Sequence, residues 1–292
     1  MTATRLDGGA RAARILEEVR AELAAPPLRG LRLRLASVSV GSHPAGSLYV
    51  RNQSRACADL GIEFHPIELP ADADEEALVR RIQDLNADPD VTGILLQRPF
   101  PPGFNARRLQ AKVHPDKDLE GMNPANLGLI VYGTPRLAPC TALAAVDLAR
   151  ASGVPFKGRE AAVIGHSEIV GKPIAFLLLN EFATATIAHI ETRDLALHTR
   201  KADFLFVAVG RPGLVTGEMV KRGAVVIDIG ISRVAGPGGE ARTVGDVEEA
   251  SVREVAGFLS PVPGGVGPMT VAMLMRNTAA AAREQASKLA AR

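Results

Sequence analysis

The sequence predicts an α/β protein with a parallel sheet, because short apolar segments typical of buried strands alternate with amphipathic segments typical of helices. This alternation occurs in two blocks, before residue 100 and after residue 158, and a stretch rich in Pro, Gly and Asn lies between them at 111–140. The chain has 292 residues. At roughly 100–200 residues per domain, this length favours two domains.

The first block begins with helical spacing of apolar residues over 7–25. Residues 31–40, LRLRLASVSV, alternate as a strand does. Helices are predicted at 48–61 and 74–86, and the second opens with acidic residues, which suit the positive end of a helix dipole. Residues 91–97, VTGILLQ, predict a short buried strand.

The second block follows the irregular stretch at 111–140, and such a stretch inside a compact protein is usually functional or a linker. A helix is predicted at 141–151, and residues 260–270 predict a constrained loop before a final Ala-rich helix that runs to the end. The elements between them are strands at 161–165, 185–189, 204–210 and 224–230, with a helix at 171–181.

The composition excludes several classes of protein. Apolar residues make up 47% and charged residues 23% of the chain, which are ordinary values for a globular protein. The net charge of +2 gives no support to nucleic acid or a membrane surface as a partner. Two cysteines are too few for a disulfide scaffold, and the six histidines lack the spacing of metal ligands. With no signal-peptide core and no long apolar run, we expect a cytoplasmic protein.

The segment GREAAVIGHSEIVGKP (158–173) combines a strand that ends at Gly165, a short loop, and a helix that begins near Gly171. Such a junction presents helix N-terminal N–H groups to an anion, usually a pyrophosphate. The spacing Gly165-x-Ser167-x-x-x-Gly171 differs from the usual G-x-G-x-x-G. On spacing alone, a dinucleotide site and a plain strand–turn–helix are equally favoured.

Other features also lie near predicted strand ends. Glu191 follows the second strand of this block, where an acid bonds ribose hydroxyls and repels a 2′-phosphate; a solvated surface glutamate is an equal interpretation. AVG (208–210) and DIG (228–230) end two strands at the edge where open sheets bind ligands. The small residues are equally explained by the needs of a turn.

Tyr49 and Gln53 share one face of a predicted helix, because they are four residues apart. A half-buried core tyrosine is the simpler interpretation of Tyr49.

Together, these motifs resemble those of the bifunctional methylenetetrahydrofolate dehydrogenase/methenyltetrahydrofolate cyclohydrolase family over nearly the whole chain. The most specific matches are the segments 207–231 and 261–278, the second of which reads PVPGGVGPMTVAMLMRNT. The other matching segments are YVRNQSRACADLGI (49–62), GILLQRPFP (93–101), PDKDLEGMNPANLG (115–128), PCT (139–141), GHSEIVGKP (165–173) and VGDV (244–247).

The resemblance implies two α/β domains flanking a cleft, the second a Rossmann-like NAD(P)-binding domain, in a homodimer. The folate-binding catalytic domain would comprise 1–140 plus 271–292, and the dinucleotide-binding domain 141–270. The implied substrate contacts are Tyr49 stacking on the folate ring, Gln97 near the one-carbon unit, Glu120 on the pterin, and Pro263, Gly264 and Gly265. The implied cofactor-binding residues are Thr141, Gly165, His166, Ser167, Ile190, Glu191, Gly210 and Ile231.

One departure from the family pattern bears on the reaction. The family has Tyr-x-x-x-Lys, and its lysine is associated with cyclohydrolase activity; here Gln53 occupies that position. A lysine carries a titratable proton and an amide does not, whereas hydride transfer depends mainly on positioning and electrostatics. We therefore expect a 5,10-methylenetetrahydrofolate dehydrogenase with weak or lost cyclohydrolase activity. The alternatives are a fully bifunctional enzyme in which another group replaces the lysine, and a repurposed folate-binding paralogue.

Departures in the cofactor segment predict NAD rather than NADP. The family's Arg and Ser that would receive a 2′-phosphate are replaced here by His166 and Ile190. Glu191 adds a negative charge that repels such a phosphate. In the folate site, Glu120 stands where the family has an aspartate, and its extra methylene moves the carboxylate by about 1.5 Å. The carboxylate can still bond to the pterin, and we therefore expect tetrahydrofolate to bind.

Overall fold

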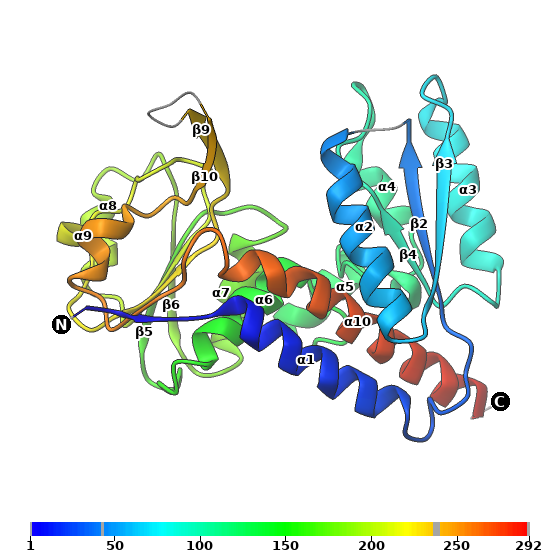
Figure 1. Ribbon diagram of the computed structural model, residues 1–292, viewed down its shortest axis with the longest axis horizontal. Helices are drawn as coiled ribbons and strands as arrows, with labels where there is room; N and C mark the ends of the chain where they lie inside the picture. Colours follow the sequence, from blue (N-terminus) through cyan, green and yellow to red (C-terminus); the bar gives the residue numbers. More distant parts are fainter. Residues whose placement is uncertain (1, 42–43, 236–239, 291–292) are drawn as a thin grey trace. The chain divides into compact units, whose positions relative to one another are not determined.

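The computed structural model describes residues 2–41, 44–235 and 240–290, and the chain divides into two compact units (Figure 1). Arg14–Cys140 together with the residues from Val271 onward form one unit, which we call the three-strand unit. The residues before Arg14 together with Thr141–Thr270 form the other, which we call the six-strand unit. Both units combine helices with a parallel sheet, which confirms the α/β fold class.

The sheet of the three-strand unit is parallel, with the strand order β3-β2-β4 in the described residues. The central strand β2 (Arg34–Val40) pairs with β3 (Glu63–Leu69) on one side and with β4 (Gly93–Leu96) on the other. Apolar residues of β2 and β4 pack against α3 (Glu75–Ala87) in the core of this unit. The predicted strands at 31–40 and 91–97 are therefore present, each shorter than predicted.

Strand β3 is an element that the sequence analysis missed. Its sequence, EFHPIEL, contains a proline and charged residues, which are unfavourable in a central strand. The strand lies at the edge of the sheet, where the missing N–H of Pro66 costs no hydrogen bond of the ladder. Its exposed position explains both the polar pattern and the failure to predict it.

The stretch at 111–140 is more ordered than predicted. It contains the end of α4 (Ala106–Lys112), a short 3₁₀ turn at Pro115–Lys117, and the helix α5 (Pro124–Val131). Asn123 caps α5 because its side chain accepts a hydrogen bond from the N–H of Ala125 at 2.8 Å. The Asn-Pro pair at the start of α5 was thus a helix signal in the sequence.

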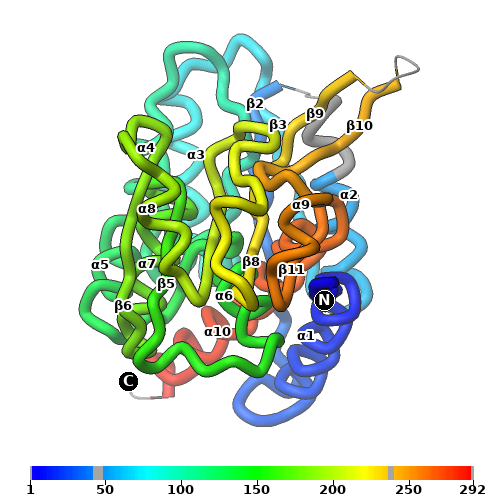
Figure 2. Tube along the Cα trace, turned by 90° about the vertical axis from the view of Figure 1, so that its left-hand side faces the viewer, coloured from blue at the N-terminus to red at the C-terminus, as the bar shows by residue number. Residues whose placement is uncertain are grey.

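The sheet of the six-strand unit has the order β1-β11-β8-β7-β5-β6, and every neighbouring pair in it is parallel in the described residues. This arrangement of strands and crossover helices is Rossmann-like. Figure 2 shows β8 beside β11 and β5 beside β6. The strands are β1 (Thr4–Arg5), β5 (Glu160–Ile164), β6 (Thr184–Ala188), β7 (Phe204–Val207), β8 (Val225–Asp228) and β11 (Phe258–Leu259).

The first strand departs from the predicted domain division, which assigned residues 1–140 to the folate domain. Strand β1 pairs with β11, with Thr4 opposite Phe258, so the start of the chain belongs to the six-strand unit. The two-residue strand lacks the periodic pattern that reveals longer strands. Its place in the sheet comes from a pairing between residues more than 250 positions apart, which no local pattern encodes.

Helices and one hairpin complete the chain. Helices α1 (Gly8–Leu23) and α10 (Val266–Ala290) each have residues in both units, and α10 begins inside the segment 260–270 that was predicted to be a loop. Among the described residues, no helix is both long and apolar enough to cross a membrane. The remaining elements are α2 (Pro44–Asp59), α6 (Cys140–Arg150), α7 (Gly171–Leu179), α8 (Leu195–Thr199), η2 (Gly217–Met219), α9 (Glu249–Arg253), and the antiparallel strands β9 (Ser232–Ala235) and β10 (Ala241–Val244).

Candidate active site

Two amide side chains meet in the three-strand unit. Gln97, which follows β4, donates a hydrogen bond from its Nε2 to Oε1 of Gln53 on α2 at 2.7 Å, and another to Oγ of Ser37 on β2 at 3.0 Å. The backbone N–H of Gln97 donates to the carbonyl of Val38 at 2.8 Å, which extends the pairing of β2 with β4. The sheet therefore fixes Gln97, and Gln97 in turn fixes the amide of Gln53.

Gln53 is fully buried, with 0% of its surface exposed, although it is polar. Its Nε2 has no hydrogen-bond partner among the described residues. A buried amide donor without a partner costs free energy, so this atom is available to an acceptor atom of a ligand or water. Tyr49, one turn earlier on the same helix, is 40% exposed. The structure thus places one of these two residues inside the unit and the other at its surface.

Glu120 is the titratable member of this site. Its Oε2 accepts a hydrogen bond from Nε2 of Gln110 at 3.3 Å. Burial raises the pKa of the Glu120 carboxyl to about 7, while the charge of Arg98 and a hydrogen bond from the backbone of Leu96 act in the opposite direction. Leu96 is the last residue of β4 and directly precedes Gln97 in the sequence. Its contact with Glu120 therefore places Glu120 at the end of β4. A carboxyl with this pKa can bind or release a proton near neutral pH.

A buried network that the sequence analysis missed holds the loop that carries Glu120. Oδ2 of Asp118 accepts hydrogen bonds from the backbone N–H of Asn123 at 2.7 Å and from Nδ2 of Asn126 at 2.9 Å. Burial raises the pKa of Asp118, against the effect of these hydrogen bonds. Gly121 adopts a φ of +64°, and a Cβ there would lie 2.3 Å from the backbone of Ala138. Asp118, Asn123 and Asn126 all lie in the segment PDKDLEGMNPANLG (115–128). The signal that could have revealed the network is that three polar residues occur so close together in this segment.

In the six-strand unit, the junction between β5 and α7 is as tight as the sequence predicts. Gly165 adopts a φ of +128°, and a Cβ there would lie 2.3 Å from the carbonyl oxygen of Ala208. A Cβ on Gly171 would lie 1.9 Å from the carbonyl oxygen of Gly165. Oγ of Ser167 accepts from the N–H of Val170 at 3.1 Å, and none of the described side chains caps the nine-residue helix α7. Only glycine allows this close approach, and the uncapped helix start suits an anionic group.

The predicted adenosine end of the cofactor site lies at the carboxyl ends of β5 and β6. Ile164 is paired with Ala188, and the rings of His166 and His189 lie beyond this pair with their centroids 5.1 Å apart. The segment from His189 to Thr192 forms a turn in which the N–H of Thr192 donates to the carbonyl of His189 at 2.9 Å. Ile190 and Glu191 are exposed on this turn. The contact between the two histidines was not predicted.

Two aspartates position the predicted cofactor contacts Gly210 and Ile231. Oδ2 of Asp246 accepts hydrogen bonds from the N–H groups of Val209 at 2.7 Å and Gly210 at 2.8 Å. Asp228, at the end of β8, accepts from the N–H groups of Gly230 and Asp246, both at 3.0 Å. Ile231 is 67% exposed directly after this turn. The aspartates therefore hold the ends of β7 and β8 in place; VGDV and DIG in the sequence contained them without indicating this role.

The segment with Pro263, Gly264 and Gly265 packs on the start of α1. The N–H of Gly8 donates to the carbonyl of Gly264 at 3.0 Å, and a Cβ on Gly8 would lie 1.7 Å from the carbonyl oxygen of Gly265. Pro263 is exposed and Gly265 is buried. Thr141, the second residue of α6, is half-buried in the same unit. At least part of the Pro/Gly-rich segment thus has a packing role in addition to its predicted substrate contacts.

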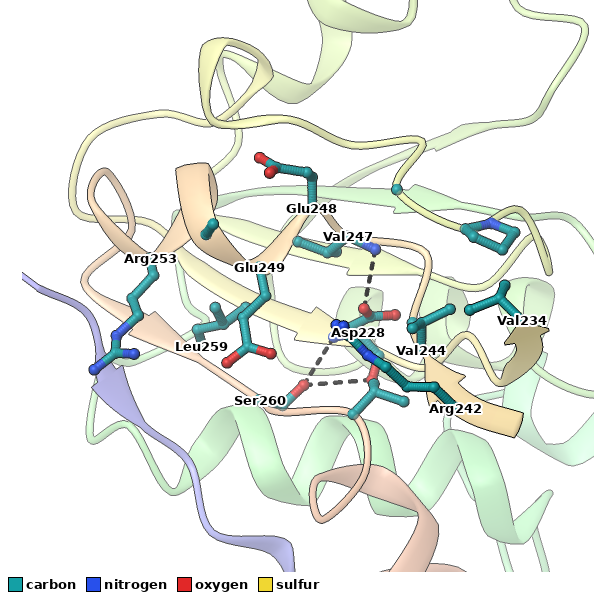
Figure 3. A pocket seen from close by; sticks show the side chains of 15 residues that line it. Asp228, Val234, Arg242, Val244, Val247, Glu248, Glu249, Arg253, Leu259 and Ser260 are labelled. Carbon is teal, nitrogen blue, oxygen red and sulfur yellow. Dashed lines mark hydrogen bonds between the residues drawn. The ribbon is translucent and has the colours of Figure 1, made fainter. Parts of the chain in front are cut away.

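A cavity of about 630 Å³ lies in the six-strand unit beside the ends of β8 and β11, α9 and the β9–β10 hairpin (Figure 3). Arg242 and Glu249 point toward Asp228 and Ser260, whereas Arg253 points away from them. Ser260 Oγ accepts from the N–H of Asp228 at 2.8 Å. Burial raises the pKa of Asp228 to about 6, against the hydrogen bonds from its backbone donors. The predicted cofactor residues do not line this cavity, so it is a separate feature of the unit.

Comparison with protein families identifies both parts of the chain. Residues 6–120 match the model of the catalytic domain of tetrahydrofolate dehydrogenase/cyclohydrolase, and residues 139–286 match the model of the NAD(P)-binding domain of the same family. The chain belongs to this family. These matches confirm the predicted family and its Rossmann-like NAD(P)-binding domain, and they identify the chain as an enzyme of the dehydrogenase/cyclohydrolase family.

Individual relatives cover almost the whole chain. The bifunctional protein FolD of Rhodobacter capsulatus is 53% identical over 280 residues, which are 96% of this chain and 93% of that protein. The Trypanosoma brucei N5,N10-methylenetetrahydrofolate dehydrogenase-cyclohydrolase, solved with NADP cofactor and an inhibitor, is 38% identical with a TM-score of 0.90 and covers 97% and 98% of the two chains. A 5,10-methylenetetrahydrofolate dehydrogenase from the silkworm Bombyx mori is 40% identical with a TM-score of 0.89, covering 98% and 99%.

Proposed function

We propose that this chain oxidises 5,10-methylenetetrahydrofolate to 5,10-methenyltetrahydrofolate with NAD, and that it hydrolyses the product weakly or not at all. In the proposed reaction, a C–H bond of the one-carbon unit breaks and its electron pair leaves as a hydride, which the nicotinamide accepts. Tyr49, Gln97 and Glu120 would bind the folate, with Pro263, Gly264 and Gly265 as further contacts. The proposed cofactor-binding residues are Thr141, Gly165, His166, Ser167, Ile190, Glu191, Gly210 and Ile231.

The single observation that carries the proposal is the state of Gln53. Its amide is buried, is held by Gln97 at 2.7 Å, and has one unpartnered donor among the described residues. An amide in this place can orient a ligand by hydrogen bonding, which is sufficient for hydride transfer. It cannot carry a proton between water and the substrate, which hydrolysis of the methenyl product requires.

Glu120 supports a second candidate function, in which the chain is fully bifunctional. The pKa of its carboxyl is raised to about 7 by burial, so it can exchange a proton in the range where the family's lysine would act. The names of the relatives also favour this reading, because the Rhodobacter capsulatus and Trypanosoma brucei proteins are both described as carrying two activities. These names argue for two activities, and the proposal of a weak cyclohydrolase rests on Gln53 alone.

The preference for NAD rests on the exposed turn after β6. Glu191 is exposed there, and Ile190 beside it offers no hydrogen-bond donor from its side chain. A carboxylate in this position bonds ribose hydroxyls and repels a 2′-phosphate. The Trypanosoma brucei relative was solved with NADP. The proposed preference for NAD therefore rests on the residues of this chain and not on the example of that relative.

We also propose a homodimer, which light scattering of the purified chain would test.

The test is an assay of the purified chain with 5,10-methylenetetrahydrofolate and either NAD or NADP, followed by an assay of the decay of 5,10-methenyltetrahydrofolate. We expect reduction of NAD and accumulation of the methenyl product. A lower KM for NADP with equal or faster turnover would contradict the cofactor preference. Decay of the methenyl product as fast as it forms would establish the bifunctional alternative. Folate binding without reduction of either cofactor would indicate a repurposed binding protein.

A further inference from the structure

We propose that Ser37 is a positioning residue for hydride transfer, because it holds the amide of Gln97 so that the carbonyl oxygen of this amide faces the one-carbon unit of the folate. The inference rests on the proposed function, since it takes Gln97 to lie near that unit. It adds a residue that neither the sequence motifs nor the family resemblance singled out. Ser37 acts through Gln97 and makes no proposed contact with the substrate or the cofactor.

Ser37 is a polar residue in the interior of the three-strand unit. It lies on the central strand β2, opposite Leu95 of β4, and only 3% of its surface is exposed. Its neighbours Ala36 and Val38 are buried in the apolar cluster that includes residues of α3. Because side chains alternate along a strand, Ser37 points to the other face of the sheet. A buried hydroxyl needs a hydrogen-bond partner, and Gln97 provides one at 3.0 Å.

The amide nitrogen of Gln97 uses both of its N–H groups within the protein. Nε2 donates to Oγ of Ser37 at 3.0 Å and to Oε1 of Gln53 at 2.7 Å. An amide nitrogen has two donors and accepts no hydrogen bond, so the oxygen Oε1 of Gln97 is the atom that remains for a ligand. Ser37 and Gln53 are buried and Gln97 is half-buried, so a ligand reaches this group of three residues at Gln97.

Two contacts from different elements fix the amide where one would not. The last torsion of a glutamine side chain has only a broad preference of its own, so external contacts set it. With the bond to Gln53 alone, the amide plane of Gln97 can still turn about that bond. Ser37 on β2 stops this rotation, and the N–H of Gln97 is itself held by the carbonyl of Val38 at 2.8 Å. The orientation of the amide therefore depends on Ser37.

This orientation matters because the proposed reaction creates positive charge. A C–H bond of the methylene carbon breaks, its electron pair leaves with the hydride to the nicotinamide, and no proton is released. The methenyl product carries a positive charge that is shared by the carbon and its two nitrogens. A carbonyl oxygen held toward that carbon stabilises the charge as it develops, whereas an N–H group turned toward it opposes it. Ser37 favours hydride transfer by keeping the N–H groups of Gln97 on the protein side.

The experiment compares Ser37→Ala with Thr92→Val in single-turnover oxidation of 5,10-methylenetetrahydrofolate, followed by the absorbance of the reduced cofactor with NAD in excess. Thr92 is the matched control, because it is also buried in the three-strand unit and its Oγ1 accepts a hydrogen bond from the N–H of Arg34 on β2 at 3.0 Å. Each variant removes one buried hydroxyl. Thr92→Val should lower the Tm and keep the wild-type rate constant.

For Ser37→Ala we expect the single-turnover rate constant to fall about tenfold. The amplitude and the KM for the folate should stay close to those of the wild type, because the proposed folate contacts remain. The amplitude separates the two explanations of a slow variant. A misfolded fraction lowers the amplitude and leaves the rate constant unchanged, whereas a misplaced Gln97 lowers the rate constant.

The double variant Ser37→Ala/Gln97→Ala tests whether Ser37 acts through Gln97. Its rate constant should equal that of Gln97→Ala, because a residue that only positions Gln97 has no further effect once this side chain is gone. The inference is overturned if Ser37→Ala keeps the wild-type rate constant, if Thr92→Val loses as much, or if the double variant is much slower than Gln97→Ala. A wild type that reduces neither NAD nor NADP overturns the proposed function, whereas an active wild type with any of the three results loses only this inference.

Discussion

The two predicted sites of this chain differ in how their polar groups are held. In the three-strand unit, Gln53 is fully buried, and its Oε1 accepts a hydrogen bond from Gln97 while its Nε2 has no partner among the described residues. In the six-strand unit, His166 is exposed in the loop after β5 and Glu191 on the turn after β6, and the parts that must fit closely are backbone atoms at glycines. One site depends on buried side chains and the other on backbone geometry.

This difference indicates which substitutions the chain tolerates. A buried polar group that loses its partner costs about 1–3 kcal/mol, whereas an exposed charge is worth less than about 1 kcal/mol. We therefore expect Gln53, where the sequence analysis places the family's lysine, to be the more consequential of the proposed departures from the family. The proposed exchanges at His166, Ile190 and Glu191 should alter the choice between NAD and NADP at little cost to the fold. The expected effects of new substitutions follow the same order.

The largest effect is expected for Gln97→Ala. This change removes the donor to both Gln53 and Ser37 and the proposed contact near the one-carbon unit. We expect kcat/KM for methylenetetrahydrofolate to fall about 100-fold. The control is Gln285→Ala, because Gln285 also donates two hydrogen bonds in the three-strand unit, to the backbone carbonyls of Thr92 and Asp116. That variant should lose stability but keep kcat/KM; equal activity losses in the two variants would contradict the account.

The next effect is expected for Gly165→Ala. The new methyl group would lie 2.3 Å from the carbonyl oxygen of Ala208, and the backbone at φ +128° is unfavourable for alanine. We expect NAD to bind about tenfold more weakly, as measured by calorimetry, with the KM for the folate unchanged. Gly158→Ala is the matched control, because Gly158 also has a positive φ (+74°) but no atom near its Cβ position. NAD affinity that falls equally in both variants would show that strain, and not the junction, is responsible.

Glu120→Gln tests the half-buried carboxyl of Glu120 by its effect on the pH dependence of stability. Because burial raises the pKa of Glu120 to about 7, the folded protein keeps the proton where the unfolded chain has lost it. The folded state therefore loses stability as the pH rises from about 4.5 to about 7. The variant removes this loss, so its Tm should gain roughly 2–4 °C on the wild type at pH 8 and less at pH 5. Glu68→Gln, on the exposed edge of β3, should give no such difference; a gain that is constant with pH would contradict the raised pKa.

The smallest effect is expected for Glu191→Gln. Removal of one exposed negative charge should raise the ratio of kcat/KM for NADP to that for NAD about threefold at pH 8. High salt should reduce the difference, because exposed charges are screened. Glu254→Gln, an exposed glutamate at the end of α9, is the control and should leave the ratio unchanged. An unchanged ratio in Glu191→Gln would remove the basis for the predicted NAD preference.

The sequence predicted the buried strands and the glycine junction because their signals are local. The strand that ends at Gly165 has an uninterrupted apolar run, and the spacing to Gly171 encodes a tight turn into a helix. Edge elements were missed for the opposite reason. Strand β3 carries Pro66 and charges that its exposed edge tolerates, and β1 is identified only by its pairing with β11. Local patterns do not contain information of that kind.

The site residues show the same limit. Glu191 could be singled out from its place after a predicted strand, and Gln53 because the resemblance to a family placed it opposite a lysine. No pattern in the sequence indicates that Gln97 bonds to Gln53, that Asp118 anchors the loop of Glu120, or that His166 contacts His189. Each of these contacts joins residues from different elements. Their partners become apparent only when the strands and helices are placed together.

The most direct test of the central claim is hydrolysis of 5,10-methenyltetrahydrofolate by the wild type, by Gln53→Lys and by the control Gln53→Met. A lysine in this buried position supplies a proton that an amide or a thioether cannot. The account predicts wild-type and Gln53→Met rates close to the uncatalysed rate, and at least about a tenfold increase in Gln53→Lys, with oxidation of methylenetetrahydrofolate retained. A wild-type chain that hydrolyses the methenyl compound as fast as it forms it, with no gain in Gln53→Lys, would contradict the claim.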